Sequence, residues 1–442
     1  MKRLYDRGVH GSTRPWWQDE APPDEELPPL EGAAEADVAV IGGGLTGLWT
    51  ALELRRRQPS LRVVVLEAAR CGDGATGRNG GFLHGLWSSL PRLIELIGDE
   101  QAVALASEAG GVHDAVRALG EDVWQSESGM LMVATAPAHD ALVERAVAAA
   151  AGVGHPDEAV LLGREELPLR SPLFRGAVLY RDGATVQPAR LVHALRRAVI
   201  ATGAVIHERT PVLGIDGSTV HTGGGTVRAP EIVLATNAAA ARWPAARTIV
   251  PFRSAIVLTE RVPDLHERVG WERGEPVSDA RTYLNYFRLT NDDRVVMGSA
   301  SGDVARAQAA LRQIFPALAH VPIAARWDGA IDVSSDRLPI VATVPGTHVH
   351  YGVGYTGNGV GPSWLVGRAL ASLALREPVT SPLATRRVPA LPPEPLRTIG
   401  ARLVRRALLA IDDAETDGRR PARWATGVAR LPSLLGLRVA SR

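Results

Sequence analysis

The chain has 442 residues, of which 45% are hydrophobic and 22% charged, and its formal net charge is +1. This composition is that of an ordinary globular protein, and it excludes a disordered, collagen-like or disulfide-bonded scaffold. The near-zero charge argues against a nucleic-acid partner, and the length predicts more than one domain.

Cysteine usage and hydropathy bear on metals and compartment. Cys71 is the single cysteine, so we expect no intrachain disulfide and no cysteine-rich metal site, and we predict no bound metal. The first residues lack the apolar core of a signal peptide, and no stretch approaches the roughly 18 apolar residues of a membrane span. These features together predict a cytoplasmic protein.

Residues 1–32 are polar and rich in proline, without the periodicity of a helix or a strand. We interpret them as an N-terminal arm that lies over its own domain, with Trp16 and Trp17 as anchors. Regular structure is predicted to begin at Asp37.

The first motif is a strand, a glycine turn, a helix and a second strand. Val38–Ile41 is an apolar run typical of a strand that is buried on both faces. It leads into the GxGxxG turn Gly42–Gly47, the helical pattern Leu48–Arg57 and a second apolar run, Leu61–Leu66, which ends at Glu67. A GxGxxG sequence alone is weak evidence, but the complete unit with an acid at its end predicts a dinucleotide site.

Each position of this turn has a physical reason. Gly42 permits the tight turn, Gly44 lets a pyrophosphate approach the backbone, and Gly47 lets the helix pack closely on the strand. The helix N-terminus offers free N–H groups to phosphates, and Glu67 is placed to accept hydrogen bonds from a ribose. The alternative is a merely tight turn between strand and helix. The predicted contacts are Gly42, Gly44, Leu45, Thr46, Gly47 and Glu67.

Two further glycine-rich loops follow. Cys71–Gly81 stands where a plain NAD domain would continue into a helix, so it favours a bulkier flavin; a flexible surface loop is the alternative. Near the other end of the chain, a strand leads into the loop Gly354–Gly359 and the helical pattern Trp364–Leu375. This second helix N-terminus would face the electron-rich pyrimidine edge of a flavin.

The middle of the chain alternates between helix-rich and mixed segments. Residues 98–150 are alanine-rich and predict helices interrupted by one strand at 129–133. The apolar run 231–238 ends in small polar residues, as expected where a strand end meets a ligand. Two runs, 283–290 and 294–299, flank a polar turn and predict a hairpin.

Several motifs, taken in this order, resemble the FAD-dependent amine and amino-acid oxidases, a superfamily that includes D-amino-acid oxidase, glycine oxidase and sarcosine oxidase. The resemblance covers roughly residues 16–425 and is greatest to the γ-glutamylputrescine oxidase branch. The motifs are GATGRNGG from Gly74, VQPARLVHAL from Val186, VLATNA from Val233, YFRLTNDDRVVMG from Tyr286, SSDRLP from Ser334 and GYTGNGVGPS from Gly354.

The resemblance implies an α/β fold with a discontinuous, Rossmann-like FAD-binding domain made of residues 33–95, 180–245 and 325–380. Residues 96–179 and 246–324 would form an α+β substrate domain, whose antiparallel sheet covers the flavin. The implied FAD contacts beyond the first turn are Ala75, Thr76, Arg78, Asn79, Gly80 and Gly81 beside the pyrophosphate and flavin, Val212 at the adenine, Ala235 and Thr236 at a strand end, and Gly354, Tyr355, Thr356, Gly357, Asn358 and Gly359 at the pyrimidine end.

Residues 381–442 remain as a basic, helical C-terminal tail. Between 391 and 442 there are ten arginines and five acids, and Ile399, Leu403, Ala407 and Ile411 recur at helical spacing. We expect this helix to pack on the FAD-binding domain. The alternative is a basic amphipathic helix that contacts a membrane or a partner.

Two positions depart from the sarcosine oxidases. Those enzymes attach their flavin to a late cysteine, whereas Cys71 lies near the expected adenosine end, so we expect FAD to be bound non-covalently. They also place an oxygen-activating lysine over the flavin, where Gly361 aligns in this chain, and Lys2 is the only lysine. The electron acceptor, oxygen or another compound, therefore stays open.

Hydride transfer to a flavin requires an oriented substrate in a dry pocket rather than a triad or a metal. Tyr286 and Arg288 alternate on one strand face, and Arg288 would hold a substrate anion by a bidentate fork or, alternatively, form a surface salt bridge. His84 would accept the amine proton or be a structural histidine. The candidate substrate contacts are Tyr286, Arg288, His84, Tyr355, Asn358 and Arg253, and we interpret Asp336 and Arg337 as an ion pair that supports the flavin loop.

These inferences predict an FAD-dependent oxidoreductase that oxidises a C–N bond of a small amine or amino acid by hydride transfer to flavin N5. The product would be an imine that water hydrolyses, with hydrogen peroxide formed if oxygen is the acceptor. The alternatives are an amine dehydrogenase with another acceptor, oxidation of a hydroxy acid on the same scaffold, and a non-catalytic flavoprotein subunit.

Overall fold

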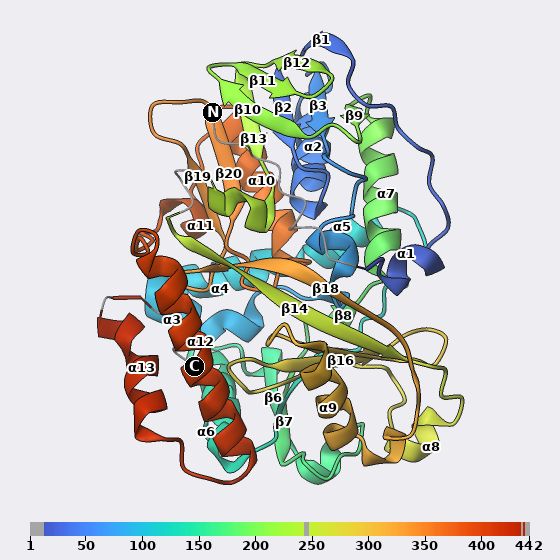
Figure 1. The fold of residues 1–442 in the computed structure, drawn as a ribbon, viewed down its shortest axis with the longest axis vertical. Coiled ribbons are helices and arrows are strands. Elements are labelled where there is room, and N and C mark those ends of the chain that lie inside the picture. Colours follow the sequence, from blue (N-terminus) through green and yellow to red (C-terminus); the bar gives the residue numbers. More distant parts are fainter. Residues whose placement is uncertain (1–12, 243–246, 435, 438–442) are drawn as a thin grey trace.

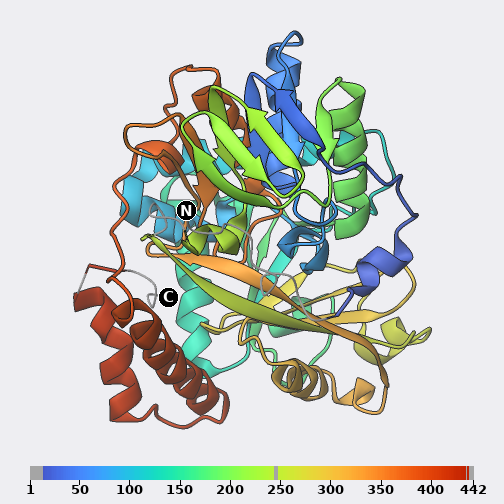
Figure 2. The ribbon, with the colours of Figure 1, turned by 45° about the horizontal axis from the view of Figure 1, so that its top comes forward.

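The computed structural model describes residues 13–242, 247–434 and 436–437. Within these residues two large sheets, of six and eight strands, occupy opposite ends of the molecule (Figure 1). A four-stranded sheet covers the six-stranded one (Figure 2), and β4 (Phe82–Leu83) forms a short pair with β8 (Ala184–Thr185). The predicted mixed α/β fold class is confirmed.

The six-stranded sheet has the order β19-β20-β13-β2-β3-β9, and its pairings are parallel except for that of β19 with β20. Successive residues face opposite sides, so that Val38 and Val40 pack in one core cluster while Ala39 and Ile41 pack in another. Because both faces are covered, every residue of β2, β3 and β13 is buried. The strands are β2 (Val38–Ile41), β3 (Val63–Leu66), β9 (Val205–His207), β13 (Glu231–Leu234), β19 (Ile340–Thr343) and β20 (Val349–Val353).

Helices cover one face of this sheet, and the four-stranded sheet β1-β12-β11-β10 covers the other. The helices begin directly after glycine turns or a proline, as the sequence predicts for α2 and α10. The covering helices are α2 (Leu45–Arg57), α7 (Pro188–Ala201) and α10 (Pro362–Ala374), and the strands are β1 (Gly32–Glu35), β10 (Val212–Asp216), β11 (Thr219–Thr222) and β12 (Gly225–Arg228).

The eight-stranded sheet has the order β18-β14-β17-β16-β15-β5-β7-β6 and is antiparallel except where β15 pairs with β5. The predicted hairpin is confirmed, because β16 pairs with β17 from Asn285 opposite Ser299, and Asp293 takes a φ of 61° in its turn. The strands are β5 (Met130–Ala134), β6 (Ala159–Gly163), β7 (Gly176–Tyr180), β14 (Ile249–Thr259), β15 (Val277–Asp279), β16 (Asn285–Leu289), β17 (Val295–Ser299) and β18 (Ile323–Ser334).

An aromatic cluster forms the core on the outer face of this sheet. Phe287 of β16 packs edge-on against Trp271 and Phe315, with ring centroids 5.8 and 5.4 Å apart. Helices α8 (Leu265–Val269) and α9 (Val304–Ile314) belong to the same cluster. The inner face, carrying alternate residues such as Tyr286, is left to face the six-stranded sheet.

The helix-rich middle is also as predicted, with β5 as its interrupting strand. The helices are α3 (Leu90–Ile97), α4 (Asp99–Gly110), α5 (Val112–Arg117) and α6 (Pro137–Gly152). The boundaries of the two predicted domains stay predictions; β18 pairs with β14 from Ile323 to Ser334 and so belongs by pairing to the eight-stranded sheet.

The N-terminal arm contains the short helix α1 (Trp16–Glu20). The side chain of Trp17 is completely buried and lies edge-on to Trp327 at 6.2 Å, while Trp16 is half-buried. Trp17 is therefore an anchor, as predicted, and residues 1–12 of the arm lie outside the described part of the chain.

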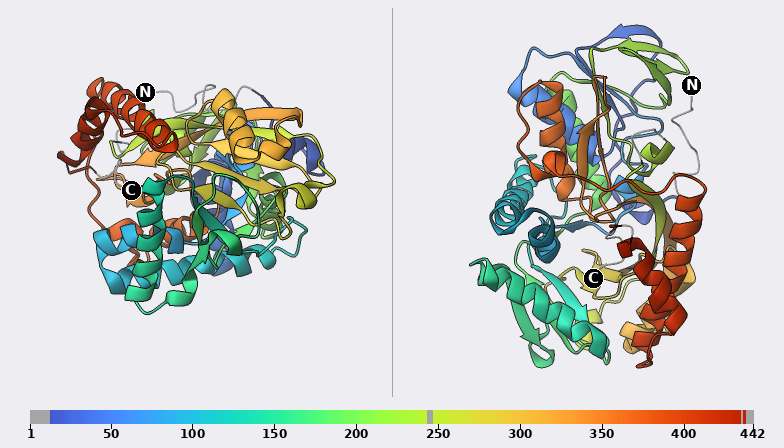
Figure 3. Two further views of the ribbon diagram at one scale, coloured as in Figure 1. Left: turned by 90° about the horizontal axis from the view of Figure 1, so that it is seen from below. Right: turned by 90° about the vertical axis from the view of Figure 1, so that its left-hand side faces the viewer.

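The C-terminal tail forms α11 (Pro382–Thr385) and a helical hairpin of α12 (Leu396–Thr416) and α13 (Arg423–Leu434) at the periphery of the molecule (Figures 1 and 3). The prediction that this helix packs on the FAD-binding domain is wrong. Asp412 of α12 instead accepts the backbone N–H groups of Thr282 (3.1 Å) and Tyr283 (2.9 Å), between β15 and β16. None of the described helices is both long and apolar enough to span a membrane.

Candidate functional site

A cavity of about 790 Å³ lies between the six-stranded and eight-stranded sheets. Ile41, Leu66 and Ala235 contribute to one side, at the carboxyl ends of three parallel strands. Met132 and Tyr286 contribute to the other, from the inner face of the eight-stranded sheet. Because parallel strands end at one edge of a sheet, the loops that follow them meet here although they are far apart in sequence.

The turn between β2 and α2 forms part of the cavity wall. Gly42 has a φ of 112°, and a side chain on it would overlap the carbonyl group of Ala235. A side chain on Gly47 would overlap the carbonyl oxygen of Gly42, so Gly47 permits close packing and does not itself line the cavity. The N-cap residue of α2, Gly44, has no side chain to cap the helix, and the N–H of Leu45 donates to Thr76 Oγ1 (3.1 Å). The positive end of α2 lies at the cavity, where it suits an anion. The cavity is lined by Gly42, Gly44, Leu45 and Thr46.

Glu67 follows β3 and lines the cavity together with Val212. Its Oε2 accepts the N–H of Gly43 (2.7 Å) and its Oε1 accepts that of Ala69 (2.9 Å). Each carboxylate oxygen keeps lone-pair capacity for a further donor, such as a ribose hydroxyl. Burial raises the pKa of Glu67 to about 7.

Two indole groups hold the loop 74–81 from outside the cavity. Trp17 Nε1 donates to the carbonyl oxygen of Asn79 (2.9 Å), and Trp327 Nε1 donates to that of Arg78 (2.8 Å). The guanidinium of Arg78 in turn donates to the carbonyl of Asp73 (2.9 Å). These bonds fix the loop so that it presents Gly74, Ala75, Thr76, Arg78, Asn79 and Gly80 to the cavity.

The prediction that Arg288 contacts the substrate is wrong. Its side chain does not line the cavity; its Nη1 donates to the carbonyl oxygens of Gly81 (3.0 Å) and Val186 (2.6 Å), and the residue is only 1% exposed. The predicted fork to a substrate anion, and equally a surface salt bridge, is contradicted because the guanidinium is buried against backbone carbonyls. Burial lowers its pKa to about 9, which leaves it charged at neutral pH. Gly81 also lies outside the cavity lining, and a side chain on it would overlap the carbonyl of Val186.

Asp332 of β18 holds the loop Gly354–Gly359. Its carboxylate accepts the N–H groups of Gly354 and Tyr355, the latter at 3.1 Å, and its own carbonyl accepts the N–H of Thr356 at 2.8 Å. Burial raises the pKa of Asp332 to about 6. Gly354 faces away from the cavity, which is lined by Tyr355, Thr356, Gly357, Asn358 and Gly359.

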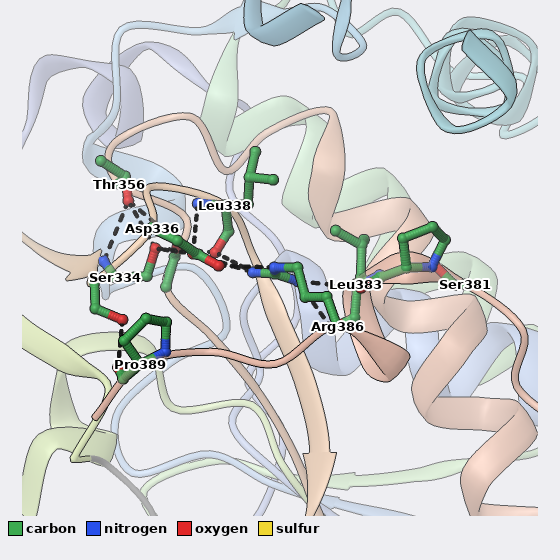
Figure 4. Close-up of polar contacts among 11 residues, drawn as sticks. Ser334, Asp336, Leu338, Thr356, Ser381, Leu383, Arg386 and Pro389 are labelled. Atoms are coloured by element: carbon green, nitrogen blue, oxygen red, sulfur yellow. Dashed lines mark hydrogen bonds and ion pairs between the residues drawn. The ribbon is translucent and has the colours of Figure 1, made fainter. Parts of the chain in front are cut away.

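A network behind this loop ties it to the tail (Figure 4). Asp336 Oδ2 accepts from Arg386 Nε at 2.8 Å, and Asp336 Oδ1 accepts the N–H of Leu338 at 3.2 Å. Both members of the ion pair are buried, with 2% and 5% of their side chains exposed. The predicted Asp336–Arg337 ion pair is therefore wrong: the partner is Arg386, and Arg337 lines the cavity with a φ of 66°.

Neutral side chains form the wall opposite these loops. The hydroxyl of Tyr286 is hydrogen-bonded to Ser254 Oγ at 2.8 Å, and its ring lies edge-on to Phe82 at 5.7 Å. Burial raises the pKa of Tyr286 to about 12. His84 lines the same cavity, its Nδ1 lies 3.2 Å from the carbonyl of Gly85, and burial lowers its pKa to about 4. The expectation that His84 titrates near neutrality is therefore wrong, and both side chains are uncharged at pH 7.

Arginines of the substrate side divide into two kinds. Arg253 does not line the cavity, because it forms a two-bond ion pair with Asp328 at 2.7 and 2.8 Å. Arg281 does line it, with its Nε 3.3 Å from the carboxylate of Asp279 and without a hydrogen-bond partner for that nitrogen in the described chain. Arg281 could not be predicted as a site residue, since no motif marks the irregular segment between β15 and β16.

Two buried amide oxygens support binding of a ligand that donates hydrogen bonds. Asn358 Oδ1 and Asn237 Oδ1 both lie at the cavity, and neither has a partner among the described residues. The hydroxyl of Tyr355 lies 2.6 Å from Thr46 Oγ1 and joins the two glycine loops. Asn237 was missed, although it directly follows Thr236 in the VLATNA motif. Ala235, Thr236 and Val212 line the cavity as predicted.

These features fit FAD as a whole. The glycine-rich N-terminus of α2 suits a pyrophosphate, Glu67 suits a ribose, and the orphaned Asn237 and Asn358 oxygens suit the hydroxyl and ring N–H donors of a flavin nucleotide. Among residues 13–242, 247–434 and 436–437, no three His, Cys, Asp or Glu side chains are grouped to hold a metal ion.

Comparisons with known proteins agree with this fit. The FAD dependent oxidoreductase (DAO) family model matches residues 37–373. Gamma-glutamylputrescine oxidoreductase of Escherichia coli K12 is 30% identical over 367 residues, which cover 78% of this chain and 84% of that protein. A probable oxidoreductase, OrdL, of Rhizobium meliloti is 30% identical over 404 residues, with 85% and 92% covered.

The structural comparison gives the same fold. The crystal structure of glycine oxidase from Geobacillus kaustophilus matches with a TM-score of 0.67 at 24% sequence identity, and it covers 80% of this chain and 99% of that one. The family match includes both large sheets and the loops that line the cavity. The chain therefore belongs to the DAO family of FAD-dependent oxidoreductases.

Proposed function

We propose that this enzyme oxidises a C–N bond of a small amine or amino acid, using FAD bound non-covalently in the cavity. The observation that carries the proposal is the joining of the three glycine loops and an uncharged wall of Tyr286 and His84 in one cavity. Bound FAD would supply the two-electron acceptor for a hydride from the substrate carbon. The relatives named for γ-glutamylputrescine and glycine support an amine or amino acid as substrate.

The wall residues would exclude water and orient the substrate rather than act as a strong base. His84 is neutral at pH 7 but too weakly basic to hold an amine proton, since its pKa is about 4. Tyr286 keeps its proton and offers one hydroxyl, which it shares with Ser254. The amine must therefore lose its proton before oxidation. Rate should rise with pH until the substrate amine is deprotonated, because a protonated nitrogen cannot stabilise the forming imine.

The position of Arg281 at the cavity favours a substrate that carries an anionic group. Its guanidinium borders the cavity, and Asp279 beside it already accepts the backbone N–H (3.0 Å) and side-chain amide (2.8 Å) of Asn285. The cavity is also lined by Met130, Met132, Leu142 and Ala146, which suit an apolar stem. A substrate with its amine near Tyr286, an apolar stem and a carboxylate near Arg281 would match both the arginine and the apolar lining.

The position of the single cysteine supports non-covalent binding of FAD. Cys71 is buried and free, does not line the cavity, and lies beside the turn, where a side chain on Gly43 would contact its sulfur at 2.5 Å. Acid denaturation should release the yellow colour into the supernatant, and colour retained in the pellet would contradict this. Cys71 as a free thiol also supports the proposed cytoplasmic location.

The electron acceptor is a separate question. A side chain on Gly361 would overlap the carbonyl oxygen of His84, so the backbone leaves no room there for a lysine. Lys2 lies outside the described residues. We propose that flavin reduced by substrate reoxidises slowly in air and that another acceptor serves the enzyme. Rapid reoxidation in stopped-flow would instead identify an oxidase that forms hydrogen peroxide.

A substrate panel tests the function. Amines, amino acids and their hydroxy-acid analogues are added without air to the purified holoenzyme, and loss of flavin absorbance is recorded. We expect bleaching by an amine, with the ammonia or aldehyde that imine hydrolysis releases. Bleaching by hydroxy acids alone would contradict C–N oxidation, and no bleaching by any compound would favour a non-catalytic flavoprotein. Gly44→Val is the control, since its side chain would fill pyrophosphate space.

A further inference from the structure

The hairpin α12–α13 carries an exposed apolar surface that the proposed redox site does not explain. Its side chains Leu396, Ile399, Leu403, Trp424, Leu431 and Leu434, here called the hairpin patch, are between 49% and 80% exposed. Elsewhere in the described chain the large hydrophobic side chains of comparable exposure are the scattered Leu161, Ile200 and Val205. A cluster of this kind indicates an interaction site, whereas single exposed apolar residues do not.

Helix geometry places these residues on one surface. Leu396 and Leu403 are seven positions apart on α12, as are Trp424 and Leu431 on α13, so each pair lies on one helix face. A shallow groove lined by Leu403, Arg406, Trp424 and Val428 joins the two helices. The hairpin patch is therefore continuous across both.

The C-terminal half of α12 is attached to the body of the protein, whereas the patch residues of α12 lie in its N-terminal half. Asp412 accepts two backbone N–H groups between β15 and β16, and Asp413 forms an ion pair with Arg306 of α9 at 2.9 Å. Ala407 and Leu408 of α12 are buried. The hairpin is thus a docked element at the periphery of the molecule (Figure 3), and the hairpin patch stays exposed on it.

The exposed charges of the hairpin are mostly positive. Its exposed arginines are Arg402, Arg406, Arg419, Arg420, Arg423 and Arg430. The exposed acids are Glu394 and Asp417, which pair with Arg397 (2.8 Å) and Arg419 (2.6 Å), while Asp412 and Asp413 bond inward. The exposed surface of the hairpin therefore combines apolar residues with a clear excess of positive charge.

We propose that the hairpin patch docks on the surface of an anionic lipid bilayer. Leucine and tryptophan side chains would enter the boundary between headgroups and acyl chains, and the flanking arginines would pair with lipid phosphates. A second copy of this chain fits less well, because a two-fold interface would bring the arginines of both hairpins together. The hairpin lies beyond residues 37–373 that match the family, and it contacts the cavity wall through Asp412 and Thr282.

Vesicle sedimentation of the full-length holoenzyme tests the proposal. Vesicles of phosphatidylcholine with phosphatidylglycerol should bind it, pure phosphatidylcholine should bind it more weakly, and about 1 M salt should release much of it. The double variant Leu403→Gln/Trp424→Gln should reduce binding about tenfold or more. The control Leu161→Gln/Ile200→Gln, which changes exposed apolar residues elsewhere, should bind like the unmodified protein.

Three results would overturn the proposal. The first is no binding of the unmodified protein to anionic vesicles. The second is equal binding of the hairpin variant and the control. The third is a concentration-dependent dimer in sedimentation velocity that Leu403→Gln/Trp424→Gln abolishes, which would make a second copy the occupant. The changed residues are exposed, and thermal melting shows whether each variant is folded.

Discussion

Arg288 reaches from β16 to two backbone carbonyls that shape the flavin loop, those of Gly81 and Val186. Arg288→Met would leave the Val186 oxygen without this donor, at about 1–3 kcal/mol for the unsatisfied group, while the Gly81 oxygen still accepts the N–H of Val186 (2.8 Å). We expect lower thermal stability and less bound FAD, with the KM for substrate changed little in the molecules that retain cofactor. Differential scanning calorimetry and flavin absorbance measure these effects.

The matched control for Arg288 is Arg253→Met. Arg253 pairs with Asp328 with 38% of its side chain exposed, so its loss should alter stability by no more than about 1 kcal/mol. Equal effects of the two variants would contradict the positioning role of Arg288. A selective rise of KM for anionic substrates in Arg288→Met would restore the predicted role as a substrate-binding fork.

Arg281 is the residue to test for recognition of a substrate anion. Arg281→Met should raise the KM for an amine that carries a carboxylate about tenfold or more, and leave that for a neutral amine unchanged, because a charge-assisted bond is lost only with the former. Steady-state kinetics with the two substrates measures the difference. Arg145→Met, at an exposed arginine that lines the same cavity, is the control and should have a smaller effect.

Glu67 should make the stability of the apoprotein depend on pH. Its pKa is raised from 4.5 to about 7 by burial, so between these values the folded state binds more protons than the unfolded state. Stability contributed by Glu67 is therefore complete below about pH 4.5 and is lost as pH rises through 7, by roughly 3 kcal/mol. Urea unfolding of apoprotein should show a smaller fall over this range in Glu67→Gln. An identical fall in both proteins would contradict the shifted pKa.

At the scale of elements, the loop Gly354–Gly359 depends on a segment of the tail. Arg386→Met would leave Asp336 buried without its cation, which typically destabilises a protein by about 3–5 kcal/mol. A clear fall in melting temperature is expected. Arg368→Met is the control, because its pair with Glu108 is 36% and 47% exposed, and its loss should have little effect. A similar small fall in both would show that the Asp336–Arg386 pair does not support the loop.

Elements whose local sequence and function coincide could be predicted. The turn Gly42–Gly47 needs glycine both for its backbone and for its ligand, so one short motif indicated strand, helix and cofactor contact together. The hairpin β16–β17 could likewise be predicted, from the alternation of apolar and polar residues and from the residues of its turn. In both cases the determining residues are neighbours in the chain.

Partners set by long-range packing could not be predicted. Alternation correctly placed Tyr286 and Arg288 on one strand face, yet it could not show that only Tyr286 borders the cavity while Arg288 meets Val186. The partner of Asp336 lies fifty positions away at Arg386. Periodicity likewise predicted α12 but not which of its faces would be buried, because that depends on the body against which it packs.

At the scale of the whole molecule, the fold builds the two walls of the cavity from different sheets. The loops that follow the parallel strands form one wall of the cavity. The inner face of the eight-stranded sheet forms the other wall, with Tyr286, Met130 and Met132. The arginine-rich hairpin is attached to the substrate side through Asp412 and lies outside the part shared with the family.

The central claim is that this cavity oxidises the C–N bond of a neutral amine. Its most direct test is the rate of flavin reduction, measured without air by stopped-flow, as a function of pH with one amine and its hydroxy analogue. We predict reduction by the amine alone, with a rate that rises with pH and levels off above the pKa of the substrate amine. Reduction by the hydroxy compound alone would contradict the claim, and a rate independent of pH would contradict the requirement for a neutral amine.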